Sequence, residues 1–237
     1  MEDTGVNNIH ELADAIRQEI SDIGDYIWKT PRFIENEYEI EAKKLSAYFP
    51  DDPELAGLRW KRETRKLDRV FPFLNATSNL FSATSVFEVY LLRIAKEVEN
   101  TSSVQLKSFR GNGIQRVFAM LKDIGVELHK IELWPQINAA LTIRNCLMHA
   151  SGLLDWSRDE KEIRRIIKSS NFLSKDHRQR RRNLDRECDE VVIYQFDLGD
   201  RIEISNEYAH LVCFYYRDFF VELCEAVLNT EIYTQHQ

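Results

Sequence analysis

The spacing of apolar residues predicts a chain built mostly from helices. An apolar side chain recurs every three or four positions through residues 8–28, 113–124 and 206–229, which is the period of a helix with one buried face. Residues 72–99 differ, because apolar side chains surround most of the helix circumference, so we expect this helix to be buried on nearly all sides. A further helix is expected at 135–150. The expected core consists of four helices, at 72–99, 113–124, 135–150 and 206–229.

The first part of the chain is more polar than the rest. We therefore interpret residues 1–70 as a helical extension or outer layer and residues 71–237 as the main domain. The second expected helix of the extension is rich in glutamate, and the third is basic after Leu58. The extension is expected to hold helices at 8–28, 32–48 and 54–70, separated at Thr30-Pro31 and by a turn at Pro50-Asp51-Asp52-Pro53.

A short β element is expected before the last helix. Residues 191–196 are rich in β-branched and aromatic side chains, and residues 201–204 alternate between polar and apolar, so the two stretches predict a small hairpin. A helix is expected at 161–168, and residues 171–190 are polar and basic. The predicted fold class is thus mostly all-α, with an N-terminal helical extension and a small β-hairpin.

Composition agrees with this plan and limits the classes of function. Hydrophobic residues make up 43% of the chain, which is enough for a substantial core, and the small numbers of Gly (8) and Pro (5) favour long helices. The net charge of −7 argues against a protein coated in nucleic acid, although it leaves room for a local basic patch.

The four cysteines indicate a reducing compartment. They have no CxxC spacing and no close histidine, so free thiols are expected rather than disulfides or a zinc site; they are Cys146, Cys188, Cys213 and Cys224. The N-terminus is acidic and polar, which argues against a signal peptide, and the chain lacks a run of about 18 apolar residues. We expect a cytoplasmic protein without a membrane partner, a metal or a cofactor.

Candidate chemistry gathers at the end of the helix expected at 135–150. Arg144 and Asn145 are followed by His149, and Gly152 is a natural residue at which to end the helix. At helical spacing Asn145 and His149 share one face, whereas Arg144 and His149 are separated by about 140° around the axis. A permanent planar cation beside a ring that titrates near neutral pH makes a site suited to a phosphate group.

The six residues from Arg144 to His149 resemble the signature of the HEPN superfamily, an Arg, commonly followed by a polar residue, with a His four to six residues on. The surroundings are similar too, because an early helix with a Phe-Glu pair, Phe87 and Glu88, precedes the motif, and a long aromatic helix closes the chain. The resemblance covers roughly residues 71–230. It implies an up-down four-helix bundle and a metal-independent endoribonuclease, commonly a homodimer whose two motif helices build one cleft.

The resemblance also implies roles for individual residues. His149 is the expected general acid or base, Arg144 the group that binds the phosphate, and Asn145 a residue that orients the imidazole or holds a phosphate oxygen. Many members act on RNA in toxin–antitoxin or anti-phage systems, so an antitoxin or defence-system protein is an expected partner; others only bind nucleotide or RNA. One toxin branch carries a Tyr two residues after the His, where this chain has Ser151, so control by nucleotide addition to that Tyr is not carried over.

Two supporting features complete the prediction. Residues 175–186 contain six basic side chains against two acidic ones, which suits a loop that guides RNA. The expected substrate-binding residues within it are Arg178, Arg180, Arg181 and Arg182. Glu88 is expected to contact Arg144 or a neighbouring helix, with a structural ion pair as its role.

A structural explanation stands beside each functional one. His149 is also explained as a histidine favoured by the helix dipole, Arg144 as an ordinary ion-pair partner, and residues 175–186 as a solvated loop. The aromatic residues around Phe214 are expected in the core rather than as a base-stacking platform. The alternatives to a nuclease are therefore a non-catalytic HEPN nucleotide- or RNA-binding module and a helical interaction scaffold.

Overall fold

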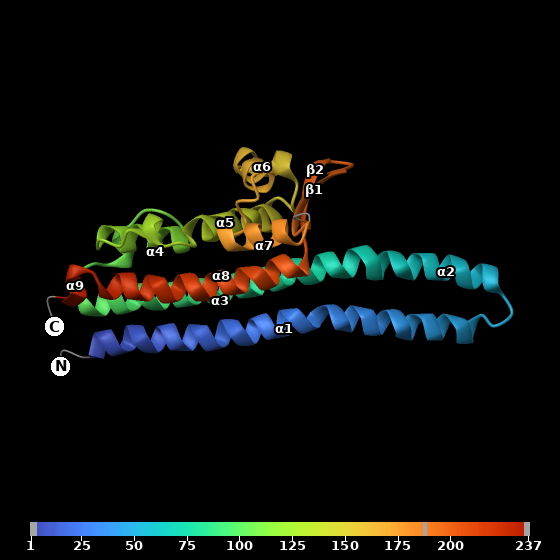
Figure 1. Ribbon diagram of the computed structural model, residues 1–237, viewed down its shortest axis with the longest axis horizontal. Helices are drawn as coiled ribbons and strands as arrows, with labels where there is room; N and C mark the ends of the chain where they lie inside the picture. Colours follow the sequence, from blue (N-terminus) through green and yellow to red (C-terminus); the bar gives the residue numbers. More distant parts are fainter. Residues whose placement is uncertain (1–3, 187–188, 235–237) are drawn as a thin grey trace.

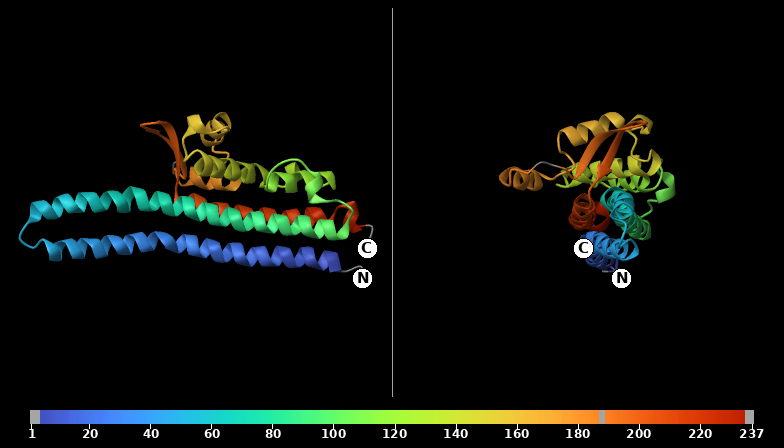
Figure 2. Two further views of the ribbon diagram at one scale, coloured as in Figure 1. Left: turned by 180° about the vertical axis from the view of Figure 1, so that it is seen from behind. Right: turned by 90° about the vertical axis from the view of Figure 1, so that its right-hand side faces the viewer.

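Three long helices form the body of the protein. The computed structural model describes residues 4–186 and 189–234. Helix α1 (Thr4–Tyr48) runs antiparallel to α3 (Phe71–Thr101) and to α8 (Asn206–Leu228), and the three lie side by side (Figure 1). The end view in Figure 2 shows them as a triangle with the shorter elements stacked on one side. The prediction of a mostly helical chain is confirmed.

A second layer of shorter elements covers α3 and α8. It contains α4 (Ile114–Asp123), α5 (Trp134–His149), α6 (Glu160–Lys168), α7 (Lys175–Asn183), β1 (Val191–Phe196) and β2 (Gly199–Ile204), and α9 (Glu231–Thr234) follows α8. The two strands pair antiparallel, with Val191 opposite Ile204, so the predicted hairpin before the last long helix is confirmed. Helices α4, α5 and α8 lie within about two residues of the expected bounds.

The core joins the N-terminal helix to the rest of the chain. The inward residues of α1 are almost fully buried and belong to the same hydrophobic cluster as the side chains of α3 and α8; they include Ile9, Ile16, Ile20 and Ile27. Phe87 on α3 stacks on Tyr216 of α8 with ring centroids 4.2 Å apart. The first half of α1 therefore contributes side chains to the same core as α3 and α8.

The expected break at Thr30-Pro31 is wrong, because α1 continues through Pro31. Proline has no N–H, so the carbonyl of Ile27 loses its normal helical donor. Asn206 on α8 replaces it, since its Nδ2 donates to the Ile27 carbonyl at 2.8 Å, and the Thr30 hydroxyl donates to the same oxygen at 2.9 Å. A side chain distant in sequence thus allows two expected helices to be one.

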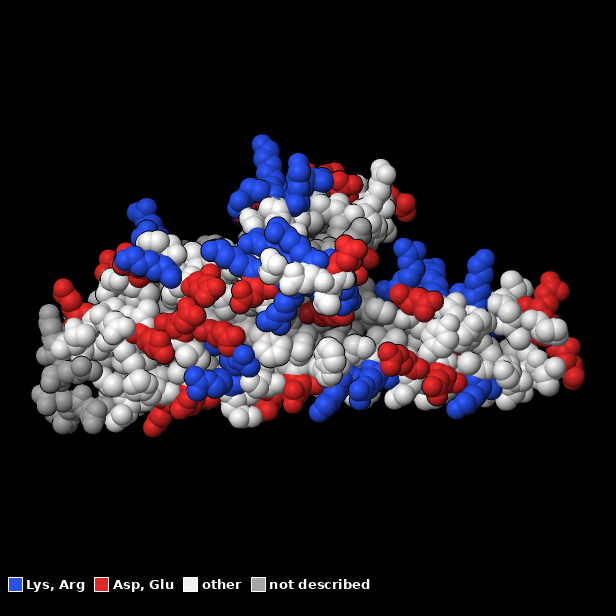
Figure 3. Space-filling model, in the orientation of Figure 1, with Lys and Arg blue, Asp and Glu red and all other residues white. Residues whose placement is uncertain are grey.

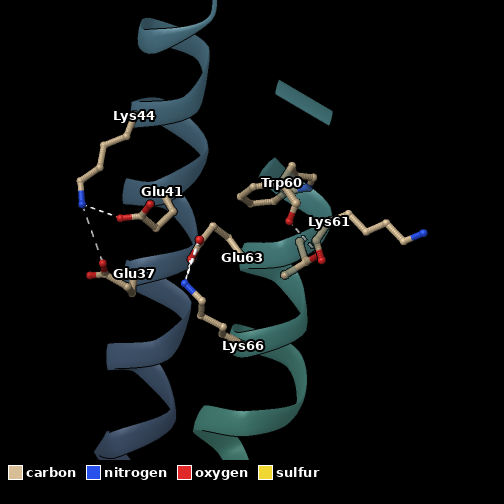
Figure 4. A network of polar contacts seen from close by, with 8 residues as sticks. Glu37, Glu41, Lys44, Trp60, Lys61, Glu63 and Lys66 are labelled. Carbon is tan, nitrogen blue, oxygen red and sulfur yellow. Dashed lines mark hydrogen bonds and ion pairs between the residues drawn. The ribbon is translucent and has the colours of Figure 1, made fainter. Parts of the chain in front are cut away.

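Beyond Pro31 the chain forms a projecting two-helix arm, residues 32–66. Helix α2 (Pro53–Arg65) runs back along the end of α1 and continues through a π-helical turn (Lys66–Val70) directly into α3, so residue 70 lies inside a continuous helical run (Figure 1). None of the arm's side chains is buried. Tyr38 of α1 and Trp60 of α2 contact each other across the arm, edge to face, with ring centroids 4.8 Å apart. The ion pairs drawn in Figure 4, such as Lys44–Glu41 and Lys66–Glu63, each lie along one side of the arm and do not link its two helices.

The expected loop at 175–186 is wrong in large part, because Lys175–Asn183 is helix α7. Ser174 caps it by accepting a hydrogen bond from the backbone N–H of His177 at 3.3 Å. Among the described residues, the helices are too short or too polar for any to cross a membrane.

Candidate functional site

Helix α5 carries the Arg144–His149 motif and ends immediately after it. Pro135 occupies the first turn, where its missing N–H costs nothing. At the other end Ser151 and Gly152 adopt positive φ, and the N–H of Gly152 donates to the carbonyl of Cys146 at 3.1 Å. A Cβ at Gly152 would lie 2.9 Å from the carbonyl oxygen of Ile202, so only glycine lets β2 approach the helix end this closely.

Arg144 is fixed between α5 and α3. Its Nη2 lies 3.1 Å from Oε1 of Glu88, and its Nη1 donates to Oδ1 of Asn145 at 2.9 Å. The Arg144 side chain is 14% exposed and that of Glu88 30% exposed. The predicted contact between Glu88 and Arg144 is confirmed, and it holds the guanidinium at the edge of the body with one rim open to solvent.

Below this pair lies an aromatic floor. Phe87, next to Glu88, is fully buried and stacks on Tyr216, whose hydroxyl lies 3.0 Å from Oγ1 of Thr84. Burial raises the pKa of Tyr216, so its hydroxyl stays protonated at neutral pH. Tyr216 is therefore a neutral support for the charged pair and not a proton-transfer group.

His149 lies at the surface as the last residue of α5. It shares the outward face of the helix with Asn145, as the spacing predicted, and its side chain is exposed. Within the described part of the chain the imidazole makes no hydrogen bond or ion pair, and Oδ1 of Asn145 accepts from Arg144 instead. The structure thus brings Arg144, Asn145 and Glu88 together and leaves His149 open to solvent five residues further on.

The flank that holds Arg144 also exposes apolar side chains. On α3, Leu92 follows Glu88 by one turn and is 46% exposed, and Val89 is 53% exposed. On α5, Met148 follows Arg144 by one turn and is 44% exposed. We refer to these three exposed residues, each within one turn of Glu88 or Arg144 along its own helix, as the apolar flank.

The arginines of α7 do not join this group. Arg178 donates to Oδ1 of Asn171 at 2.8 Å, and Arg181 pairs with Glu190 and, at 3.5 Å, with Glu207 at the start of α8. Arg180 and Arg182 are exposed. The end view in Figure 2 shows α7 standing out on the side of α8, away from α3, so a single copy separates these arginines from the Glu88–Arg144 pair.

Other clusters in the described ranges have structural explanations. Asp189, Glu190 and Glu207 place carboxylate oxygens within 4.8 Å of one another, the only such spacing found there, but Arg181 and Arg186 pair with two of the three. This group is an ion-pair network. Burial raises the pKa of the Cys146, Cys213 and Cys224 thiols, which agrees with unreactive buried cysteines. Cys188 lies outside the described residues.

One polar cluster was missed by the sequence reasoning. Oγ of Ser174 lies 2.7 Å from Nδ1 of His177, and the hydroxyl of Tyr215 accepts from the backbone N–H of Ser174 at 2.8 Å. Burial, followed by the charge of Arg180, lowers the pKa of His177, so the imidazole is neutral and suited to this contact. A serine three residues before a histidine was the available signal, and it marks a helix cap rather than a nucleophile.

A comparison of the chain with family models, with curated proteins and with solved structures gives no match. The HEPN resemblance therefore stays a prediction that depends on the residues of the motif and their surroundings.

Proposed function

We propose that the chain is a metal-independent endoribonuclease of the HEPN type that acts as a homodimer. The observation that supports the proposal best is that the last turns of α5 carry both a fixed arginine, Arg144, and a histidine exposed to solvent, His149. In this proposal α3, α4, α5 and α8 correspond to the up-down four-helix HEPN bundle, and α1 with the arm is the addition.

The proposed reaction breaks the RNA chain without an external nucleophile. The ribose 2′-oxygen bonds to the adjacent phosphorus while the bond from phosphorus to the 5′-oxygen of the next nucleotide breaks. One proton leaves the 2′-hydroxyl and one joins the departing 5′-oxygen, so the products are a 2′,3′-cyclic phosphate and a 5′-hydroxyl. His149 of one copy accepts the first proton, and His149 of the second copy delivers the other.

Arg144 stabilises the charge that develops on the phosphoryl oxygens. Nε of Arg144 is buried, so the N–H groups that remain to face a phosphate are those of Nη1 and Nη2 not engaged by Asn145 and Glu88. Fixing the group before the substrate arrives avoids the cost of ordering it in the transition state. Glu88 and Asn145 are therefore positioning residues in this mechanism.

The apolar flank supports the dimer. A second copy placed over Leu92, Val89 and Met148 would remove these side chains from water, which is the main driving force for association. A two-fold axis there brings two α5 helices together and assembles two Arg144–His149 pairs in one cleft. Within one helix, Arg144 and His149 point about 140° apart. In the dimer, Arg144 of one copy can act together with His149 of the other.

The basic side chains of α7 supply attraction for RNA. Figure 3 shows Lys and Arg gathered over the upper layer of the molecule, where α6 and α7 lie. Arg180 and Arg182 are the exposed members of the predicted set and are the ones we propose to contact phosphates, while Arg178 and Arg181 hold α7 in place. Such contacts raise affinity without selecting a sequence.

A biological role follows from the activity. A nuclease of this kind harms the cell that makes it, so we propose a toxin or anti-phage role with an antitoxin or other defence protein as partner. The site we expect such a partner to cover is the cleft formed by the two α5 helices.

The alternative is a non-catalytic RNA- or nucleotide-binding module. It is favoured by one specific observation, that the guanidinium of Arg144 is already paired within its own chain. In that case Arg144 has a structural role and His149 contributes to binding only.

The test is RNA cleavage by the purified protein in EDTA, with the ends analysed for cyclic phosphate. We expect His149→Ala to lower the rate by about 10²-fold or more while RNA binding persists, because it removes proton transfer. His129→Ala is the matched control, since His129 is also an exposed histidine but lies far along the chain from the motif. An RNA with a single 2′-deoxy substitution at the cleaved position should resist cleavage.

The outcomes separate the candidates. RNA binding without cleavage supports the module, and the absence of both overturns the proposal. Arg144→Lys is preferred to Arg144→Ala, because the alanine leaves Glu88 without its partner and loss of folding would imitate loss of catalysis.

A further inference from the structure

A cavity of about 750 Å³ lies where the arm joins the body. Its walls come from the middle of α1, the π-helical turn, the first residues of α3 and the segment that links β2 to α8. Its volume falls in the range of pockets that hold small molecules. The apolar part of the lining consists of Pro31, Ile34, Tyr38, Leu67, Pro72, Phe73 and Ile204.

A proline and a π-helical turn both lie at this cavity. Pro31 lies in one wall and the π-helical residues Leu67, Asp68 and Arg69 lie in another. A π-turn inserts one extra residue into a helix and is found frequently at functional sites. The open space between α1 and the start of α3 is therefore bounded by a proline on one side and a π-turn on the other.

The charges around the cavity are mostly negative. Glu35, Glu39, Asp68 and Glu203 line it together with one cation, Arg69. Over the residues that the structure describes, Glu35 and Asp68 take part in no ion pair, and Glu39 reaches only the exposed Lys43, at 4.0 Å. The guanidinium of Arg201, which lies against the ring of Phe73, is a second cation beside the cavity. The rim still holds more carboxylates than cations.

The amides at the floor of the cavity are already satisfied. Nδ2 of Asn75 donates to Oγ1 of Thr30 at 2.9 Å and to Oδ1 of Asn206 at 3.1 Å, while Nδ2 of Asn206 donates to the backbone. These groups fix the shape of the floor and do not require a ligand. The feature of the cavity that can select a ligand is a set of water-accessible carboxylates next to apolar surface.

We propose that this cavity binds an organic cation with an apolar body. The cation pairs with Glu35, Asp68 and Glu203, and the apolar part packs against Ile34 and Phe73. The same chemistry is offered by a free aliphatic amine and by a lysine or arginine side chain of a partner peptide. RNA is excluded, because its phosphates would meet the carboxylates of the rim.

The cavity is connected to the end of the motif helix by one side chain. The guanidinium of Arg201 lies 4.5 Å from the ring centroid of Phe73, and its Nε donates to the carbonyl of Ser151 at 3.1 Å.

Binding in the cavity does not depend on the proposed nuclease activity. His149→Ala, which removes catalysis in that proposal, should leave ligand binding unchanged.

The test is calorimetric titration of the full chain at low salt with two probes, spermidine and acetyl-Leu-Arg-amide. Neutralising the rim with Glu35→Gln and Asp68→Asn together should weaken binding by about ten-fold or more. The matched control neutralises two exposed carboxylates elsewhere, Asp123→Asn and Glu231→Gln, and should change the affinity by less than about two-fold. Both pairs change the net charge equally.

A third variant separates the cavity from general charge attraction. Ile34→Trp places a large side chain in the cavity without changing any charge and should abolish binding, while circular dichroism and thermal unfolding verify that the variant is folded. Binding of spermidine alone assigns a free amine, and binding of the peptide alone assigns a basic side chain. Absence of binding by both probes, equal losses in the two double variants, or unchanged binding by Ile34→Trp overturns the proposal.

Discussion

Two polar groups in this protein have no partner in their own helix and are paired by a side chain from another helix. The carbonyl of Ile27 has no helical donor because Pro31 follows four residues later, and Asn206 supplies one at 2.8 Å. At the other polar junction Glu88 supplies a carboxylate to Arg144 at 3.1 Å. In both cases the partner comes from another helix, so the local structure depends on the assembled core.

The repair at Pro31 gives a testable prediction. Asn206→Ala removes the donor to Ile27 and the acceptor of Asn75 and Asn79, which should cost about 1–3 kcal/mol of unfolding free energy. In a Pro31→Ala background the backbone regains an N–H for the Ile27 carbonyl, so the same substitution should cost less. Urea unfolding of the four proteins measures the difference, and an equal cost in both backgrounds would contradict the account.

At the scale of elements, apolar periodicity predicted each helix that buries an apolar face in the core along most of its length. It located α3, α4, α5 and α8 to within about two residues. Helix α7 was missed because Lys175–Asn183 contains no apolar residue, so its helical form depends on the Ser174 cap and the contacts of Arg178 and Arg181. The continuity of α1 through Pro31 was missed because it depends on a hydrogen bond from Asn206, which is distant in sequence.

The candidate site was likewise predictable only in part. The adjacency of Arg144 and Asn145, the outward position of His149 and the contact of Arg144 with Glu88 follow from helical geometry and from the need to pair a charge within an apolar helix. The separation of the α7 arginines from this pair does not, because it is set by the path of the chain after α6. Sequence spacing carries no information about that path.

The two halves of α1 should contribute very differently to stability. Before Pro31 the helix is in the core, whereas the arm has no buried side chain. Replacing residues 36–62 by a short glycine-serine linker should leave the body cooperatively folded, because no buried side chain is removed. A short linker can join the two helices at this point, since Tyr38 and Trp60 contact each other there. The slope of the denaturant transition should fall, since less surface is exposed on unfolding.

Two point variants control for the arm deletion. Ile16→Ala, in the core half of α1, should cost about 2–5 kcal/mol, because Ile16 is fully buried. Ile40→Ala, in the arm, should cost much less, because Ile40 is 44% exposed. Chemical denaturation followed by circular dichroism measures both. Comparable costs, or loss of cooperative folding on deletion of the arm, would show that the arm is part of the folding unit.

At the scale of the whole molecule, the aromatic and thiol-rich core makes stability sensitive to alkaline pH. Burial raises the pKa of the Cys213 and Cys224 thiols from 9.0 to about 12, and it also raises the pKa of Tyr208 and Tyr216. A raised pKa means that the folded state holds its proton at a pH where the unfolded state has released it. The unfolded state then binds fewer protons, so stability falls as pH rises.

The window of this effect extends from about pH 9 towards the folded pKa values. Each thiol should reduce the unfolding free energy by about 1.4 kcal/mol per pH unit once the unfolded thiol is ionised. The double variant Cys213→Ala and Cys224→Ala has a lower stability at neutral pH because of the lost packing, but its decline between pH 9 and 11 should be shallower. The tyrosines are common to both proteins, so the difference in slope isolates the thiols. Parallel declines would mean that these two cysteines are accessible to water in the folded protein, and the packing of α8 against α1 and α3 would then have to be looser than described.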